Sequence, residues 1–236
     1  MGIITAHSGC DGTEDNSLEF VTYALRSEAG CLEVDVRKGQ DGDLILSHDD
    51  NGGEGVFLRN VFERMAQVPE KMINCDLKER DLEIPVYRMA CHFHMEERLI
   101  YSGEVDPVHL EENKKNFEKA RIFLNIENLY PDIYKEEEQD RERKLKEAIE
   151  KAASLPVTCI NAEYHILTDE IITFIKGKGL GCSAWTVNDE KELKRLMIRK
   201  AENITTRNLK GAILVKKEME LRHGGAYYHI SPWGLS

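Results

Sequence analysis

The sequence predicts an α/β fold, a closed (β/α)8 TIM barrel that forms a single domain over residues 1–236. Short apolar runs alternate along the chain with stretches of helical spacing, and about eight such units fit a chain of this length. The alternative is an open, doubly wound sheet, which usually carries a glycine-rich phosphate loop after its first strand. Residues 7–12 read HSGCDG, which is not GxGxxG, so the barrel is favoured.

Buried strands are predicted where four to seven mostly apolar residues are bounded by polar or turn-forming ones. The expected barrel strands are residues 2–7, 31–36, 72–78, 98–102, 121–126, 158–162, 181–187 and 203–206. The run DLILSHDD follows a turn at Asp41-Gly42 and is expected to be a hairpin partner or an extension of the second strand.

Helices are predicted between these strands from the spacing of apolar residues. Leu18, Val21 and Ala24 share one helical face, and Ser17 is a suitable N-cap. The expected helices are residues 17–29, 56–68, 110–120, 135–153, 169–176 and 190–201. The charged residues of 135–153 are read as a solvated face, because one side of that helix is apolar.

Charge and composition narrow the classes of partner. The chain has 32 Lys and Arg against 43 Asp and Glu, a net charge of −11, which argues against binding nucleic acid or anionic membranes. No apolar stretch approaches a membrane span, and no secretory signal is visible, so we expect a cytoplasmic protein. Six cysteines without a CxxC pair indicate buried, reduced thiols. The tail, residues 223–236, is aromatic for an exposed terminus, which leaves two alternatives open: packing on the barrel, or packing on a second subunit in a homo-oligomer.

Residues with chemical potential gather at the predicted strand ends, where barrel enzymes carry their active sites. Glu33 and Asp35 are two apart, as are Asp76 and Lys78, so each pair faces one side of its strand. The full set is His7, Glu33, Asp35, His48, Asp76, Lys78 and Trp185. Buried ion pairs, such as Asp76 with Lys78 and Glu33 with Arg37, are the structural interpretation of these residues.

The functional interpretation treats the set as a unit. Three carboxylates at neighbouring strand ends are the hard oxygen donors that Mg²⁺ or Ca²⁺ prefers. His7 and His48 then supply a general acid and a general base. We favour this interpretation because all these groups converge on one end of one fold.

Several segments resemble the glycerophosphodiester phosphodiesterase family. AHSG…DNSLEF…CLEVDVRKGQDGDLILSHDD is similar to the opening of that family, which reads AHRG…ENTL.AF…IE.DV…DG…V..HD. NCDLK resembles the E.K motif of its third strand, LIYSGEVDPVHL its fourth strand, SAWTVN its TVN segment and ENITTRNL its last strand, which usually ends in T-D. The resemblance covers nearly the whole chain, and its first fifty residues are the specific part.

The resemblance implies a (β/α)8 barrel that hydrolyses small glycerophosphodiesters. It implies one divalent metal ion, Mg²⁺ or Ca²⁺, held by Glu33, Asp35 and Asp76, where Asp76 departs from the usual Glu. It assigns His7 and His48 to acid–base catalysis. It places Lys78 near the metal and the phosphate, and Trp185 on the pocket wall. Glu127, which follows the predicted fifth strand, is a further polar candidate for substrate binding.

Two departures from the family pattern bear on activity. Ser8 stands where the family has an arginine that reaches the phosphate, and one neutral hydroxyl replaces a charged, bidentate fork. Arg37 and Arg59 are candidates to replace that charge, and Ser8 is kept as a substrate-binding candidate. The cap that the family commonly inserts after its His-Asp motif is missing, because only NGGEGVFLRN separates that motif from the next helix.

We therefore expect a metal-dependent phosphoric diester hydrolase that acts on a small soluble phosphodiester. Two alternatives remain open. One is a catalytically impaired barrel that binds a phosphorylated ligand, which Ser8 favours. The other is a lyase that releases a cyclic phosphate as its end product.

Overall fold

Eight parallel strands close into a ring in the computed structural model, which describes residues 2–112 and 119–224. The strands of the ring are β1 (Ile3–Ala6), β2 (Cys31–Lys38), β5 (Met72–Leu77), β6 (Leu99–Gly103), β7 (Arg121–Asn125), β8 (Cys159–Glu163), β9 (Gly181–Trp185) and β10 (Asn203–Thr206). Each pairs with the next, and β1 pairs with both β10 and β2. The predicted TIM barrel is confirmed, and the doubly wound sheet is excluded.

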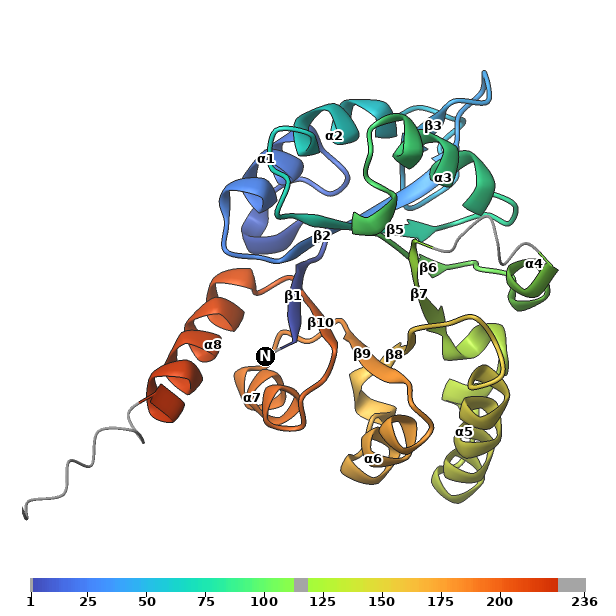
Figure 1. Cartoon of the computed structure of the whole chain (residues 1–236), viewed down its shortest axis with the longest axis vertical. Coiled ribbons are helices and arrows are strands. Elements are labelled where there is room, and N and C mark those ends of the chain that lie inside the picture. The colour runs from blue at the N-terminus through green and yellow to red at the C-terminus, as the bar shows by residue number, and fades with distance from the viewer. Residues whose placement is uncertain (1, 113–118, 225–236) are drawn as a thin grey trace, which may run out of the picture.

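Helices surround this ring on its outside (Figure 1). They are α1 (Leu18–Arg26), α2 (Leu58–Met65), α3 (Glu83–His92), α4 (Pro107–Glu112), α5 (Glu138–Ala152), α6 (Asp169–Gly177), α7 (Glu190–Ile198) and α8 (Leu209–Gly224). Their apolar faces and the outward side chains of the strands form one core, in which Phe20, Phe62 and Ile149 are fully buried. Burial of this apolar area drives the helices onto the ring.

Ser17 caps α1 as predicted, because its hydroxyl accepts a hydrogen bond from the backbone N–H of Phe20. Two helices were not predicted, α3 and α8. The expected helix over residues 56–68 is shorter than predicted, because Val56–Phe57 forms strand β4 before α2 begins. Helix α4 covers only the start of the expected helix over residues 110–120, and residues 113–118 lie outside the described part of the chain.

The end of β2 continues into a short antiparallel extension. The strand β3 (Leu44–Leu46) pairs with the end of β2, and β4 pairs with β3. This confirms the predicted hairpin partner. The extension carries the chain outward and returns it to the ring with His48 just beyond β3.

The inside of the ring is layered. Cys31, Ile100, Phe123 and Cys159 form a small apolar cluster near the starts of their strands. The next inward positions are polar, and the last ones carry the acidic and basic groups. This order places the chemistry at the carboxyl ends of the strands. Within the described residues, no helix has both the length and the apolar character needed to cross a membrane.

Candidate active site

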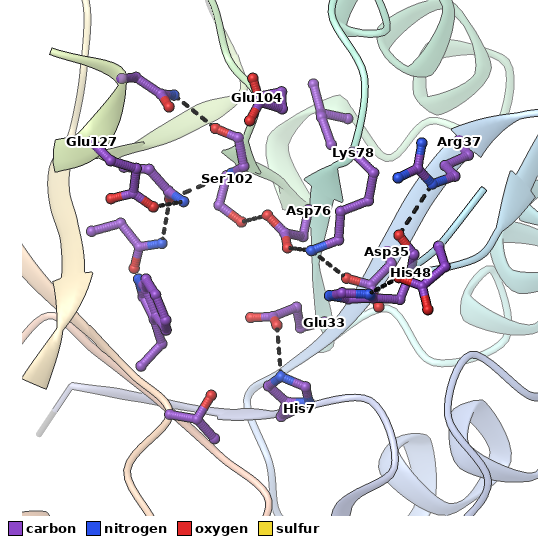
Figure 2. Close-up of a pocket in the computed structure, with 18 of the residues that line it drawn as sticks. His7, Glu33, Asp35, Arg37, His48, Asp76, Lys78, Ser102, Glu104 and Glu127 are labelled. Atoms are coloured by element: carbon purple, nitrogen blue, oxygen red, sulfur yellow. Dashed lines mark hydrogen bonds and ion pairs between the residues drawn. The ribbon is translucent and has the colours of Figure 1, made fainter. Parts of the chain in front are cut away.

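A cavity of about 520 Å³ opens at the carboxyl end of the ring (Figure 2). Strand ends and the segments just beyond them supply its walls. The ionisable lining residues are His7, Glu33, Asp35, Arg37, His48, Asp49, Asp76, Lys78, Glu104, Glu127 and Arg207. Its neutral lining includes Ser102, Asn125, Asn128, Asn161, Trp185 and Thr186.

Eight of the nine side chains selected from the sequence line this cavity. They are His7, Glu33, Asp35, His48, Asp76, Lys78, Glu127 and Trp185. Ser8 is the exception, since it is only 1% exposed and is absent from the cavity wall. Its hydroxyl accepts a hydrogen bond from the backbone N–H of Asn16. Ser8 therefore stabilises the loop that contains Asn16 and does not face the cavity.

Lys78 lies between two of the carboxylates. Its ammonium is 2.9 Å from Asp35 Oδ1 and 2.5 Å from Asp76 Oδ2. Parallel register explains the cluster, because Asp35 and Asp76 are direct partners on β2 and β5. Burial favours the neutral form of Asp35, but Lys78 and Asn16 outweigh it and lower the pKa of Asp35. For Asp76 burial prevails over Lys78, and the pKa is raised.

The expected pairing of Glu33 with Arg37 is wrong. Arg37 Nη1 lies 3.4 Å from Glu79 Oε1, and its Nε donates to the backbone oxygen of His48 at 3.1 Å. Glu33 instead faces His7, with 3.7 Å between Glu33 Oε1 and His7 Nε2. Arg37 lies four residues beyond Glu33 and directly follows the buried part of β2, so it reaches the rim and not the interior.

The surroundings of Glu33 disfavour its ionised form. Burial, reinforced by the negative charges of Asp76 and Asp35, raises the pKa of Glu33 to about 7, although His7 opposes this shift. Asn74 Nδ2 donates to Glu33 Oε2 at 3.2 Å, and Thr205 Oγ1 donates to the same oxygen at 3.3 Å. These neutral donors orient the carboxylate without supplying a positive charge.

The two histidines differ in setting. His7 is 19% exposed, and its Nδ1 donates to the carbonyl oxygen of Ser8 at 2.7 Å, which leaves Nε2 toward Glu33 and the cavity. His48 is 67% exposed, and its Nδ1 lies 2.8 Å from Asp49 Oδ1. In both rings the contact at Nδ1 leaves Nε2 for a reacting group.

A chain of polar side chains follows the inner wall of the ring from Glu33 to Glu127. Its hydrogen bonds join Thr205, Asn203, Ser183, Asn161 and Asn125 in sequence. Asn125 Nδ2 then donates to Glu127 Oε1 at 3.0 Å, and the Tyr134 hydroxyl donates to Glu127 Oε2 at 3.0 Å. Both oxygens of Glu127 are thus engaged, and burial raises its pKa. The network fixes the floor of the cavity.

Trp185 closes one wall. Its ring meets Tyr134 edge to face, with 6.3 Å between the ring centroids. Its indole Nε1 is buried and has no hydrogen-bond partner among the described residues. An unpaired indole donor on a cavity wall suits a ligand oxygen.

Gly103 makes room for the carboxylate of Asp76. A Cβ on Gly103 would lie 2.4 Å from Asp76 Oδ1 and 2.2 Å from the backbone oxygen of Leu77. Its φ of +80° also lies in the region that favours glycine. The carboxylate therefore packs against bare backbone, while Ser102 Oγ donates to it at 3.0 Å.

Sequence reasoning missed the cavity positions of Arg207, Glu104 and Asn125. Arg207 is the most informative of these because it adds a cation at the rim. The T-D ending expected for the last strand gave no signal for an arginine there. Arg59, proposed as a replacement cation, is exposed on α2 and does not line the cavity.

The donor chemistry suits a divalent cation. Glu33, Asp35 and Asp76 bring hard oxygen atoms to one cavity and exceed the charge of Lys78 by two when all are ionised. Burial is the largest cause of the raised pKa of Glu33, and the negative charges of Asp76 and Asp35 add to it. In the described residues no three acidic, histidine or cysteine side chains are already grouped as ligands of one ion. Lys78 occupies the position between Asp35 and Asp76, so an ion would share those carboxylates with it.

The barrel and this cavity define a (β/α)8 protein with two histidines and clustered carboxylates at the carboxyl end of its strands. Solved structures of several other proteins have the same fold as this chain. A protein assigned provisionally as a glycerophosphoryl diester phosphodiesterase, from Agrobacterium tumefaciens, matches with a TM-score of 0.76 at 14% identity, over 94% of this chain and 99% of that one. The glycerophosphodiester phosphodiesterase from Thermotoga maritima matches with a TM-score of 0.68 at 20% identity, over 94% and 99%.

A phosphodiesterase from Oleispira antarctica, solved with the product sn-glycerol-3-phosphate, matches with a TM-score of 0.67 at 15% identity, over 92% of this chain and 97% of that one. No protein-family model and no curated protein matches the sequence. The chain thus has the fold of the glycerophosphodiester phosphodiesterases.

Proposed function

We propose that this chain is a metal-dependent phosphodiesterase that hydrolyses a small glycerophosphodiester, or a similarly polar phosphodiester, to an alcohol and glycerol phosphate. The observation that carries the proposal is the convergence of His7, His48, three carboxylates and Lys78 in one cavity at the carboxyl end of the barrel. The fold shared with a phosphodiesterase solved with sn-glycerol-3-phosphate supports the substrate class.

Glu33, Asp35 and Asp76 would hold the divalent ion, either Mg²⁺ or Ca²⁺. When bound, such an ion neutralises charge on the phosphodiester and orients its oxygens. Lys78 adds a positive charge beside the same carboxylates, which favours an anionic substrate near them.

The histidines move the protons. A glycerol hydroxyl next to the ester attacks phosphorus, one histidine accepts its proton, and the other protonates the departing alcohol oxygen. The bond between phosphorus and that oxygen breaks, and a cyclic phosphate forms, which water then opens with the proton transfers reversed. The carbonyl of Ser8 and the carboxylate of Asp49 hold the two rings so that each Nε2 is free to exchange a proton.

The test is turnover of a panel of glycerophosphodiesters with Mg²⁺, Ca²⁺ or Mn²⁺, and with a chelator. We expect metal-dependent turnover that falls by about 10²–10⁴-fold in His7→Ala and in His48→Ala. His165→Ala is the matched control, because His165 is also exposed and paired at Nδ1 with a carboxylate, Glu163, but lies outside the cavity wall. Full activity in His48→Ala, or in chelator, would contradict the proposal.

The same assay addresses the alternatives. Phosphorus NMR of the products separates a hydrolase, which ends at glycerol phosphate, from a lyase, which ends at the cyclic phosphate. Binding of glycerol 3-phosphate without turnover of any substrate would indicate the catalytically impaired barrel.

A further inference from the structure

Arg207 stands beside His7 at the rim of the cavity. It directly follows β10, and Ala6 and Thr206 are register partners on β1 and β10. The backbone N–H of His7 donates to Thr206 O at 3.0 Å, and Asp11 N–H donates to Arg207 O at 2.9 Å. The barrel register thus fixes the backbone of Arg207 next to that of His7.

The side chain of Arg207 is held by one acidic partner, Asp15. Arg207 Nη2 lies 3.0 Å from Asp15 Oδ1, and Nη1 donates to Asp15 Oδ2 at 3.4 Å. The pair crosses Gly9, where a Cβ would lie 2.2 Å from Asp15 Oδ1 and 3.2 Å from Arg207 Nη1. The missing side chain of Gly9 lets the pair sit directly over the loop that carries His7.

Of the three lysine and arginine side chains on the described cavity wall, Arg207 is the one most able to bind an incoming anion. Lys78 is shared between the carboxylates of Asp35 and Asp76. Arg37 is engaged with Glu79 and the His48 carbonyl. Arg207 is 45% exposed and its partner Asp15 is also exposed, so solvent weakens their attraction and the guanidinium can exchange partners at low cost.

We propose that Arg207 is the anion-binding side chain that holds the phosphate group of substrate and product beside His7, with Asp15 keeping its guanidinium in position when the cavity is empty. The guanidinium fork suits two phosphate oxygens at once. This inference rests on the proposed phosphodiesterase function. Arg207, which directly follows the last strand, would supply at the cavity rim the positive charge that the buried, neutral Ser8 does not.

The test is calorimetric titration of glycerol 3-phosphate, and of inorganic phosphate as a second probe, into the full-length protein with Mg²⁺ present. Arg207→Gln is expected to raise both dissociation constants at least tenfold and to raise the KM for the diester. Arg207→Lys is expected to recover part of the affinity, because it restores the charge without the fork. Arg199→Gln is the matched control, because Arg199 forms a comparably exposed pair with Asp169 away from this cavity.

The outcomes separate the two proposals. Wild-type protein that turns over the diester, together with unchanged phosphate affinity in Arg207→Gln, overturns the role of Arg207 and leaves the proposed function standing. Equal losses in Arg207→Gln and Arg199→Gln also overturn it, since a general charge effect then explains both. Wild-type protein that neither binds glycerol 3-phosphate nor hydrolyses any diester overturns both. Thermal melting of each variant identifies any loss that comes from unfolding.

Discussion

The side-chain amide of Asn16 binds both the carboxylate and the backbone N–H of Asp35. Asn16 Nδ2 donates to Asp35 Oδ2 at 2.7 Å, and Asp35 N–H donates to Asn16 Oδ1 at 3.0 Å. Both residues are buried, and Asn16 adopts a φ of +53°, which asparagine tolerates better than most residues. One amide therefore sets the position of a proposed metal ligand, and both its nitrogen and its oxygen take part.

Replacing Asn16 is expected to weaken metal binding without abolishing the fold. Asn16→Gly keeps the positive φ available and removes the amide, so it separates orientation of Asp35 from backbone strain. Groups that orient metal ligands typically contribute about 10–100-fold in metal affinity or activity. We expect a Mg²⁺ dissociation constant raised within that range, measured by calorimetry. Asn51→Ala is the control, since its exposed side chain donates to the Glu54 carbonyl, away from the carboxylates. Equal affinity in wild type and Asn16→Gly would contradict this prediction.

Lys78 stabilises the metal-free protein. Lys78→Met leaves Asp35 and Asp76 without their cation, and breaking a buried pair in this way costs about 3–5 kcal/mol. We expect a loss of that order in the free energy of unfolding, measured by urea denaturation in chelator, and partial recovery with Mg²⁺. Lys217→Met breaks only an exposed pair with Glu28 and should change stability by less than about 0.5 kcal/mol. Equal stability of the Lys78 and Lys217 variants would refute the prediction.

Glu33 makes the metal-free protein less stable as the pH rises. Its pKa is about 7 in the folded protein against 4.5 as its ordinary value, so in between the folded state binds more protons than the unfolded state. Below about pH 4.5 Glu33 is protonated in both states and has no effect; by pH 7–8 the penalty is fully developed. We expect Glu33→Gln to gain stability relative to wild type over this interval, by on the order of 2–3 kcal/mol.

The measurement is the free energy of unfolding of both proteins at several pH values, first in chelator and then with Mg²⁺. Added Mg²⁺ should stabilise wild type more than Glu33→Gln, because only the carboxylate gains from a cation. A difference between the two proteins that does not vary with pH would show that Glu33 ionises normally.

Cysteine chemistry should be confined to one residue. All six thiols are free, and Cys10, Cys31, Cys75, Cys159 and Cys182 are buried, whereas Cys91 is exposed. Burial, with Asp11 nearby, raises the pKa of Cys10 to about 12, so it is a poor nucleophile although it lies close to His7 in sequence. Iodoacetamide should modify Cys91 alone in the native protein, as read by peptide mass spectrometry, and turnover should persist. Loss of turnover that accompanies modification of Cys10 would contradict this.

The sequence was most informative about the interior of the barrel. Strand periodicity placed Glu33, Asp35 and Asp76 on one face, and the closed ring then brought those faces together. Predicting α3 and α8 was harder for different reasons. Pro85 lies in the first turn of α3, where proline is tolerated but looks like a break in the sequence. In α8 the apolar residues Ile213, Leu214 and Val215 are consecutive, which obscures helical spacing.

Two features of the site depended on tertiary contacts that spacing cannot show. Ser8 follows His7 directly, yet its hydroxyl turns to the backbone of Asn16 and not to the cavity. Arg207 is some 200 positions from His7 along the chain, and only the closure between β1 and β10 makes them neighbours. A sequence motif describes residues that are close along the chain. Arg207 at the cavity rim is distant from His7 in the sequence, so the motif around His7 gives no indication of it.

The bare backbone at Gly103 also constrains how this protein can vary. A side chain there would have to displace either the Leu77 carbonyl, which is backbone, or the Asp76 carboxylate, which Lys78 and Ser102 hold in place. In a saturation-mutagenesis map, position 103 should therefore tolerate no substitution, although glycine takes part in no chemical step. A variant that lengthens Asp76 to glutamate meets the same restriction, so the side chains that the proposed metal site can accept are limited by a neighbour on the adjoining strand.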